Sequence, residues 1–135
     1  QQLSSHPTIV CDTGHNPDAM KQIAEQLKVM VLDEGRNLHI VIGMCKDKDV
    51  ERATAYLPDE ADYYFTQASV KRAMPAEELQ KLAANRGLQG TCYPDVVSAV
   101  RAAQEKASPD DFIFVGGSFF VVADLLSHRD ALNLD

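Results

Sequence analysis

Short apolar runs alternate with stretches of helical periodicity along the whole chain. The first apolar run covers residues 8–11 and has the length and composition of a buried strand. The apolar positions that follow it keep a spacing of three and four, which predicts an amphipathic helix whose inward face carries Met20, Ile23, Ala24, Leu27 and Val31. The same alternation predicts further strands over residues 38–44, 62–66, 90–93 and 112–115, with helices between them.

Polar residues and prolines mark where these helices begin. Asn16 is a natural N-cap, and Pro17 suits the first turn that follows it. Either Asp47 or Asp49 can cap the helix after the second strand, and Asp95 can cap the helix before the last strand. The helix starts therefore agree with the boundaries that the apolar pattern predicts.

The segment over residues 112–126 has two possible local structures. Apolar arms flank the Gly-Gly-Ser run of residues 116–118, which would suit a hairpin. The second arm, however, continues into good helix formers and ends in His128 and Arg129, which are cations at the place that a helix dipole favours. We therefore expect a strand, a turn and a helix.

Short, almost wholly apolar strands that alternate with helices are typical of a parallel sheet covered on both faces. We expect an α/β fold: a three-layer Rossmann-like domain with a mostly parallel sheet of five or six strands and helices on both faces. The 135 residues are enough for one domain of ordinary size.

Composition and charge narrow the range of partners. Thirteen basic and twenty acidic side chains give a net charge of −7, which argues against nucleic acid or an acidic membrane as a partner. No apolar run approaches the ~20 residues of a membrane span, and the first residues do not have the pattern of a signal peptide. Cys11, Cys45 and Cys92 lie far apart at the ends of apolar runs, so we expect inert thiols in a reducing cytoplasm and no metal site.

The turn after the first strand concentrates polar chemistry. Asp12, His15 and Asn16 lie between a strand and a helix, at the edge of an α/β sheet where ligands bind. Asp12 either binds a ligand or only caps the helix, and the residues alone leave both open. His15 can donate to a carboxylate or a phosphate. His39, in contrast, falls within a strand, where a structural role is expected.

Three further polar groups follow strands and so fall at the same edge. Ser118, after Gly116 and Gly117, suits an anion, although a plain turn with a serine N-cap explains the run equally well. Lys46 follows the second strand and Arg72 follows the third. Their convergence favours a ligand site at this edge.

Several enzyme classes are excluded because a required residue is missing. The chain contains no phosphate loop, no Gly-x-Gly-x-x-Gly fingerprint and no Gly-x-Ser-x-Gly elbow. A haloacid dehalogenase needs a second carboxylate where Gly14 stands. A response-regulator receiver needs its aspartate where Thr66 stands.

Four stretches carry a resemblance to a known family. The Asp-Thr-Gly-His-Asn-Pro run of residues 12–17 resembles the Asp-Gly-Ala-His-Asn-Pro motif of folylpolyglutamate and dihydrofolate synthases, which are members of the Mur ligase superfamily. Residues 43–49 are similar to the family's Gly-Met-x-Lys-Asp-Lys-Asp, while residues 66–73 and 116–122 resemble two of its later loops. This chain departs from the family motif at two positions, where Thr13 and Gly14 replace Gly and Ala. Both changes exchange one small residue for another.

The resemblance implies a role for each residue of this edge. Asp12 and Asn16 would bind ATP, His15 and Ser118 would bind glutamate, and Lys46 and Arg72 would make weaker anion contacts. The chain would be the C-terminal domain, over residues 6–135, of an ADP-forming ligase, preceded by a linker remnant over residues 1–5. It would be inactive alone, because the family's N-terminal ATPase domain holds the phosphate loop, the ligands of Mg²⁺ and the folate cleft.

Under this interpretation the parent enzyme joins L-glutamate to a folate or dihydropteroate carboxylate through an acyl phosphate. The sequence leaves open which of these two substrates it uses, because the pterin is held outside this chain. Two alternatives remain: a stand-alone Rossmann-like module that binds a small anion, and the C-terminal domain of a peptidoglycan-precursor Mur ligase. The Asn-Pro pair and the Lys-Asp-Lys-Asp loop favour the folate branch over the second of these.

Overall fold

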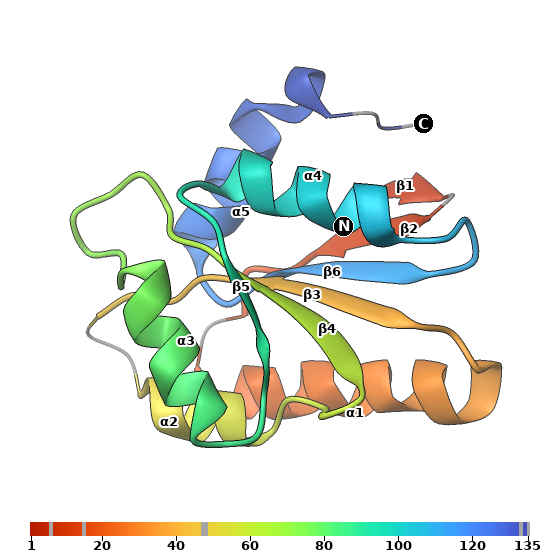
Figure 1. Cartoon of the computed structure of the whole chain (residues 1–135), viewed down its shortest axis with the longest axis horizontal. Helices are drawn as coiled ribbons and strands as arrows, with labels where there is room; N and C mark the ends of the chain where they lie inside the picture. The colour runs from red at the N-terminus through yellow and green to blue at the C-terminus, as the bar shows by residue number, and fades with distance from the viewer. Residues whose placement is uncertain (6, 15, 47–48, 133, 135) are drawn as a thin grey trace.

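The computed structural model describes residues 1–5, 7–14, 16–46, 49–132 and 134. Strands and helices alternate along these residues as the apolar pattern predicts (Figure 1). The strands are β1 (Gln2–Ser5), β2 (Thr8–Cys11), β3 (Leu38–Ile42), β4 (Ala61–Phe65), β5 (Gly90–Cys92) and β6 (Phe112–Gly116). The helices are α1 (Pro17–Glu34), α2 (Val50–Ala55), α3 (Ala76–Ala84), α4 (Val96–Lys106), α5 (Phe119–Ser127) and the 3₁₀ helix η1 (Arg129–Ala131).

The strands of the described residues form one six-stranded sheet in the order β1-β2-β6-β3-β4-β5. Every neighbouring pair is parallel except β1 and β2. The last strand, β6, lies between β2 and β3, so that Phe112 is in register with both Thr8 and Leu38. The carboxyl ends of the five parallel strands therefore meet at one edge of the sheet, on the left in Figure 1.

Helices cover both faces of the sheet, which gives the expected three layers. One core lies between the sheet and helices α1, α2 and α3, and contains Met20, Leu27, Ile40, Phe65 and Leu79. The other lies between the sheet and helices α4 and α5, and contains Ile9, Val41, Val100, Ile113 and Leu125. Among the described helices, none is long and apolar enough to span a membrane.

Side-chain caps fix the helix starts that the sequence predicts. Asn16 Oδ1 accepts a hydrogen bond from Ala19 N at 2.8 Å, and Asp95 caps α4 by accepting from Ser98 N at 2.7 Å. Asp49 is the cap of α2, while Asp47, the alternative cap, lies outside the described residues. The ambiguous C-terminal segment is a strand, a turn and a helix, as expected.

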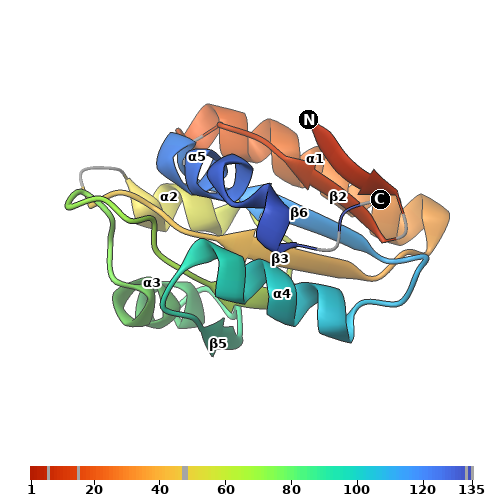
Figure 2. The same ribbon diagram turned by 90° about the horizontal axis from the view of Figure 1, so that it is seen from above.

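Residues 2–5, which the sequence analysis assigns to a linker remnant over residues 1–5, form strand β1 of the sheet. This strand pairs antiparallel with β2 at the outer edge of the sheet (Figure 2). Leu3 and Ser4 are each only 5% exposed, and Leu3 packs into the core of α4 and α5. A four-residue strand with two buried positions is too short for its periodicity to distinguish it from a linker.

Candidate functional site

The loops that follow β2, β6, β3 and β4 form a continuous surface, here called the carboxyl rim. Backbone hydrogen bonds join each loop to the next strand: Asp12 N donates to Val115 O at 3.1 Å, and Gly43 N donates to Gly116 O at 3.2 Å. Thr66 N donates to Ile42 O at 2.9 Å. The rim is therefore a direct extension of the sheet, and its residues are held at fixed spacings.

Asp12 begins the rim at the end of β2. Its Oδ1 accepts a hydrogen bond from Gly14 N at 2.7 Å, which closes a tight turn, and its side chain is exposed. Asn16, not Asp12, caps α1, so the cap role that the sequence left open for Asp12 belongs to its neighbour. His15, the predicted glutamate ligand of this turn, lies outside the described residues.

Ser118 lies on the adjacent loop, but its side chain is buried. Its Oγ accepts a hydrogen bond from Phe120 N at 3.0 Å, and the residue is 3% exposed. Cys45 Sγ, from the loop after β3, contacts this oxygen at 3.7 Å. Ser118 is thus the N-cap of α5, as the simpler interpretation of this turn predicts, and a ligand would contact it only if the hydroxyl turned away from Cys45.

Gly117 lets these two loops approach each other. Its φ is +97°, and a Cβ built on it would lie 2.5 Å from Gly43 O. Both the backbone conformation and the lack of space therefore require glycine at this position. The backbone of the Gly-Gly-Ser run therefore determines how closely the loops after β3 and β6 approach each other, independently of any ligand.

Lys46 and Arg72, the two weaker candidates for anion contact, are brought together. Lys46 N donates a hydrogen bond to Arg72 O at 2.8 Å, and both side chains are exposed. An isolated bridge between Cys45 and Ala73 holds the same two loops. The rim thus presents two neighbouring cations after β3 and β4, on the same edge of the sheet as Asp12, within a chain of net charge −7.

The sequence analysis missed an aromatic pair at this rim. Phe119 and Phe120 open α5, and the Arg72 guanidinium lies 5.7 Å from the centre of the Phe120 ring. Phe119 is 60% exposed. Apolar spacing marks both residues as helix positions, but it does not show that the first ring faces solvent.

A buried thiol, Cys11, lies at the end of β2, where the rim begins. Burial raises the pKa of the Cys11 thiol, which keeps it protonated and unreactive. Among the described residues, no group of three or more histidine, cysteine, aspartate or glutamate side chains could hold a metal ion.

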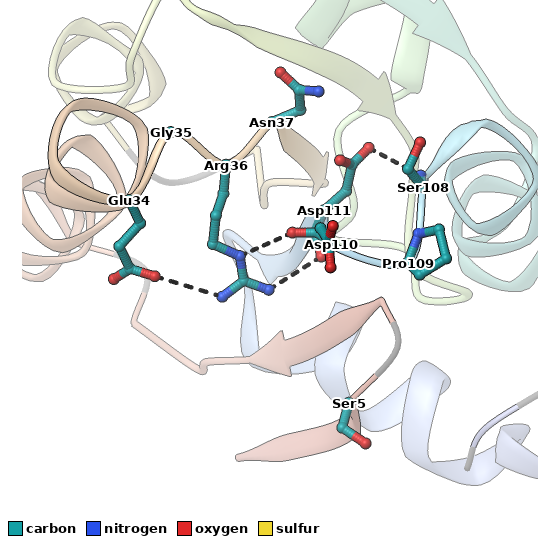
Figure 3. A pocket seen from close by; sticks show the side chains of 9 residues that line it. All are labelled: Ser5, Glu34, Gly35, Arg36, Asn37, Ser108, Pro109, Asp110 and Asp111. Atoms are coloured by element: carbon teal, nitrogen blue, oxygen red, sulfur yellow. Dashed lines mark hydrogen bonds and ion pairs between the residues drawn. The ribbon is translucent and has the colours of Figure 1, made fainter.

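A pocket of about 710 Å³ lies at the opposite edge of the sheet, the amino rim (Figure 3). Its central cation, Arg36, donates to Asp110 O at 2.9 Å, to Asp111 O at 3.2 Å and to Thr8 Oγ1 at 2.8 Å. The guanidinium also lies over the Phe112 ring. Because the donors of Arg36 already bond to this chain, the pocket is a depression around a structural network, and the carboxyl rim remains the candidate functional site.

A buried hydrogen-bond network lies next to Arg36. His39 Nε2 is 2.8 Å from Asp111 Oδ2, and His39 Nδ1 is 2.8 Å from the Tyr64 hydroxyl. Burial raises the pKa of Asp111, but hydrogen bonds from His39 and Ser108 N outweigh it, so the net pKa lies below its usual value. The structural role expected for His39 is therefore explained by its contacts.

Comparison with known proteins identifies a family to which the chain is similar. The model of the family described as "Mur ligase, glutamate ligase domain" matches residues 1–119. A probable bifunctional folylpolyglutamate synthase/dihydropteroate synthase of Haloferax volcanii is 34% identical over 125 residues, which are 90% of this chain and 14% of that protein. The dihydrofolate synthase/folylpolyglutamate synthase of Escherichia coli is 33% identical over 132 residues, 97% of this chain and 30% of that protein.

Solved structures agree with these relatives. E. coli FolC in complex with DHPP and ADP superposes with a TM-score of 0.85 and 30% identity, and the match covers 97% of this chain and 30% of that one. A bifunctional folylpolyglutamate synthase/dihydrofolate synthase with Mn, AMPPNP and L-glutamate bound superposes with a TM-score of 0.81 and 26% identity, over 96% of this chain and 30% of that one. The chain thus spans less than a third of the length of these proteins. It belongs to the Mur ligase family and corresponds to its glutamate ligase domain.

Proposed function

We propose that this chain is the part of an ATP-dependent ligase that presents nucleotide and L-glutamate to a folate or dihydropteroate carboxylate. The observation that carries the proposal is the convergence of Asp12, Lys46 and Arg72 on one rim that the backbone holds rigidly. The relatives that match are named as synthases of this type, and one solved neighbour carries a nucleotide analogue, manganese and L-glutamate.

The proposed reaction has two steps. The γ-phosphoryl group of ATP moves to a carboxylate oxygen, which gives ADP and an acyl phosphate. The amine of glutamate then attacks the acyl carbon, the C–O bond to phosphate breaks, and the nitrogen loses a proton as the amide forms. Both steps need the reactants held in line and water kept out, and a rigid rim that closes on a second domain serves both needs.

Each rim residue has a chemical role in this proposal. Asp12 repels phosphate, so its carboxylate would accept hydrogen bonds from the hydroxyl groups of the nucleotide, next to the turn that Asn16 caps. Lys46 and Arg72 would attract phosphate or glutamate carboxylates. His15 and Ser118 are proposed for glutamate because of the family resemblance. The divalent cation that such reactions use would neutralise charge on the phosphates, and among the described residues no cluster of three or more histidine, cysteine, aspartate or glutamate side chains could hold it.

The test is a ligation assay on the full-length protein that contains this chain. Radiolabelled L-glutamate is supplied with ATP and either dihydropteroate or reduced folate, and both the amide product and ADP are measured. We expect equal amounts of the two, and a loss of at least tenfold in kcat/KM for Asp12→Ala. Asp110→Ala, which removes an exposed carboxylate at the amino rim, is the matched control and should retain the wild-type rate.

Other substrates and the isolated chain complete this test. Ligation to a UDP-linked peptidoglycan precursor, but not to either pterin substrate, would replace the folate assignment with a peptidoglycan one. The isolated 135 residues should form no amide, because they lack a phosphate loop. Glutamate ligation by these residues alone would contradict the proposed division of labour.

A further inference from the structure

An exposed aromatic ring at the carboxyl rim has no role in the function proposed so far. Phe119 is the first residue of α5, directly after Ser118, and it is 60% exposed. Burying such a side chain stabilises a protein by roughly 1.5–3 kcal/mol, and most of that gain is forgone here. Single exposed apolar residues are common, so the contacts of Phe119 have to carry the argument.

Phe119 belongs to a cluster of two rings and a cation. The Phe120 ring meets it edge to face, with centroids 5.7 Å apart and an interplanar angle of 83°. The Arg72 guanidinium lies 5.7 Å from the centre of the Phe120 ring. The loop that carries Arg72 is tied to the loop after β3 by the hydrogen bond from Lys46 N. The cluster therefore joins the start of α5 to the loop after β4, and that loop is held in turn by the loop after β3.

This cluster matches one ligand chemistry, a planar heteroaromatic ring with an anionic tail. A half-exposed ring braced by a second ring offers a stacking face, because aromatic groups attract each other at such distances. Arg72 supplies positive charge next to that face. The first turn of α5 adds no carboxylate, whereas α1, α2 and α3 carry Asp18, Glu51 and Glu77 in theirs. Asp12 is the opposing charge on the rim, and it would face the polar middle of such a ligand.

We propose that Phe119 is a stacking residue for the heteroaromatic ring of an anionic substrate, with Phe120 bracing it and Arg72 holding the ligand's charge. The inference rests on the proposed function and adds a binding residue to it. One substrate of that reaction has this chemistry at the rim: the nucleotide, whose purine is the ring and whose phosphates are the anionic tail, whereas the pterin is expected to bind outside this chain. The residue would then help to select ring-bearing substrates over simple anions.

The experiment is an NMR titration of the full-length protein that contains this chain, with ¹³C-labelled phenylalanine rings and ¹⁵N-labelled amides. ATP, reduced folate and tripolyphosphate are added separately. We expect ATP to shift the Phe119 ring signals, and tripolyphosphate to shift amides near Arg72 while it leaves the ring signals in place. A shift of the ring signals by reduced folate alone would overturn the assignment to the nucleotide. Phe119→Leu should weaken binding of ATP about fivefold or more, which is the effect of losing one stacked ring. Phe119→Tyr should retain it.

Leu32→Ala is the control, since Leu32 is an 81% exposed apolar side chain on α1, and it should change no affinity. An unchanged affinity in Phe119→Leu, or ring signals that no ligand moves, would overturn the stacking role. If amides of the rim still respond to ATP in that case, the proposed function stands without it. Loss of the proposed function itself would be detected separately, by the ligation assay on the full-length protein.

Discussion

The two edges of the sheet use polar residues in opposite ways. At the amino rim, His39, Asp111 and Tyr64 bond to one another inside the protein, and Arg36 bonds to two backbone carbonyls and a hydroxyl. At the carboxyl rim, the Asp12 side chain bonds only to its own turn among the contacts described, and it is exposed. The first edge is a closed network, while the second is held rigid by backbone and presents side chains outward.

This difference separates a structural site from a binding site more clearly than pocket size does. The 710 Å³ depression lies at the amino rim, where the polar groups are already bonded. A ligand there would have to compete with bonds that the fold itself uses, at a cost for each buried group left unpaired. At the carboxyl rim a ligand can bind exposed groups without breaking the fold, which is what a substrate site requires.

The largest expected effect follows from breaking the amino-rim network. Asp111→Ala leaves His39 Nε2 and Ser108 N without their buried acceptor. We expect a loss of about 3 kcal/mol in the free energy of unfolding, since removing a buried carboxylate leaves two hydrogen-bond donors without their acceptor. Urea denaturation measures it. Asp110→Ala, the exposed neighbour, should cost less than about 0.5 kcal/mol. Equal losses in the two variants would mean that the network is not structural.

The next effect concerns the backbone of the carboxyl rim. Gly117→Ala should cost about 2 kcal/mol, because alanine disfavours a φ of +97° and its Cβ would lie 2.5 Å from Gly43 O. Gly87→Ala separates these two causes, since Gly87 has a φ of +80° but no atom within 4 Å of the added Cβ. It should cost only about 1 kcal/mol. Thermal unfolding of both variants measures the difference, and a Gly87 variant that loses as much as the Gly117 variant would show that crowding plays no part.

A smaller effect depends on pH. The pKa of Asp111 is lower in the folded chain than its ordinary value. A carboxyl group of this kind stabilises the fold above its unfolded-state pKa of about 4, and this contribution is lost as the pH falls toward the folded-state value. Stability should therefore fall between about pH 5 and pH 3, and less steeply in Asp111→Asn than in the wild type. Parallel curves of unfolding free energy against pH for the two proteins would rule out this linkage.

The sequence predicted the local structure of both edges because local structure follows from short-range chemistry. Strand 8–11 matches its prediction to the residue, and Asn16, Asp49 and Asp95 cap the helices that they were expected to cap. The parallel three-layer fold followed from strands too apolar to have a solvated face. The assignment of site residues at the carboxyl rim stays a prediction, although the backbone brings the described ones together.

What the sequence did not predict depends on contacts between distant segments. His39 and Asp111 are 72 residues apart, and Cys45 and Ser118 are 73 apart, so no spacing rule connects them. Strand β1 was missed because its place in the sheet depends on pairing with β2, not on its own pattern. The burial of Ser118 and the exposure of Phe119 are opposite outcomes for adjacent residues, and only the packing of α5 on the rim decides between them.

The smallest expected effect on stability is also the most informative about function. Asp12→Ala removes one exposed hydrogen bond, to Gly14 N, and should cost no more than about 1 kcal/mol in the free energy of unfolding. Asp12→Asn keeps an acceptor oxygen and should cost less still. Both substitutions remove the charge that the proposed nucleotide contact uses, so the loss of kcat/KM should far exceed the loss of stability. At the amino rim the order is reversed, because Asp111→Ala should lower the free energy of unfolding by about 3 kcal/mol while it changes kcat/KM little. A loss of 3 kcal/mol in Asp12→Ala, measured by the same urea titration, would make the two rims equivalent and remove the physical basis for placing the site at this one.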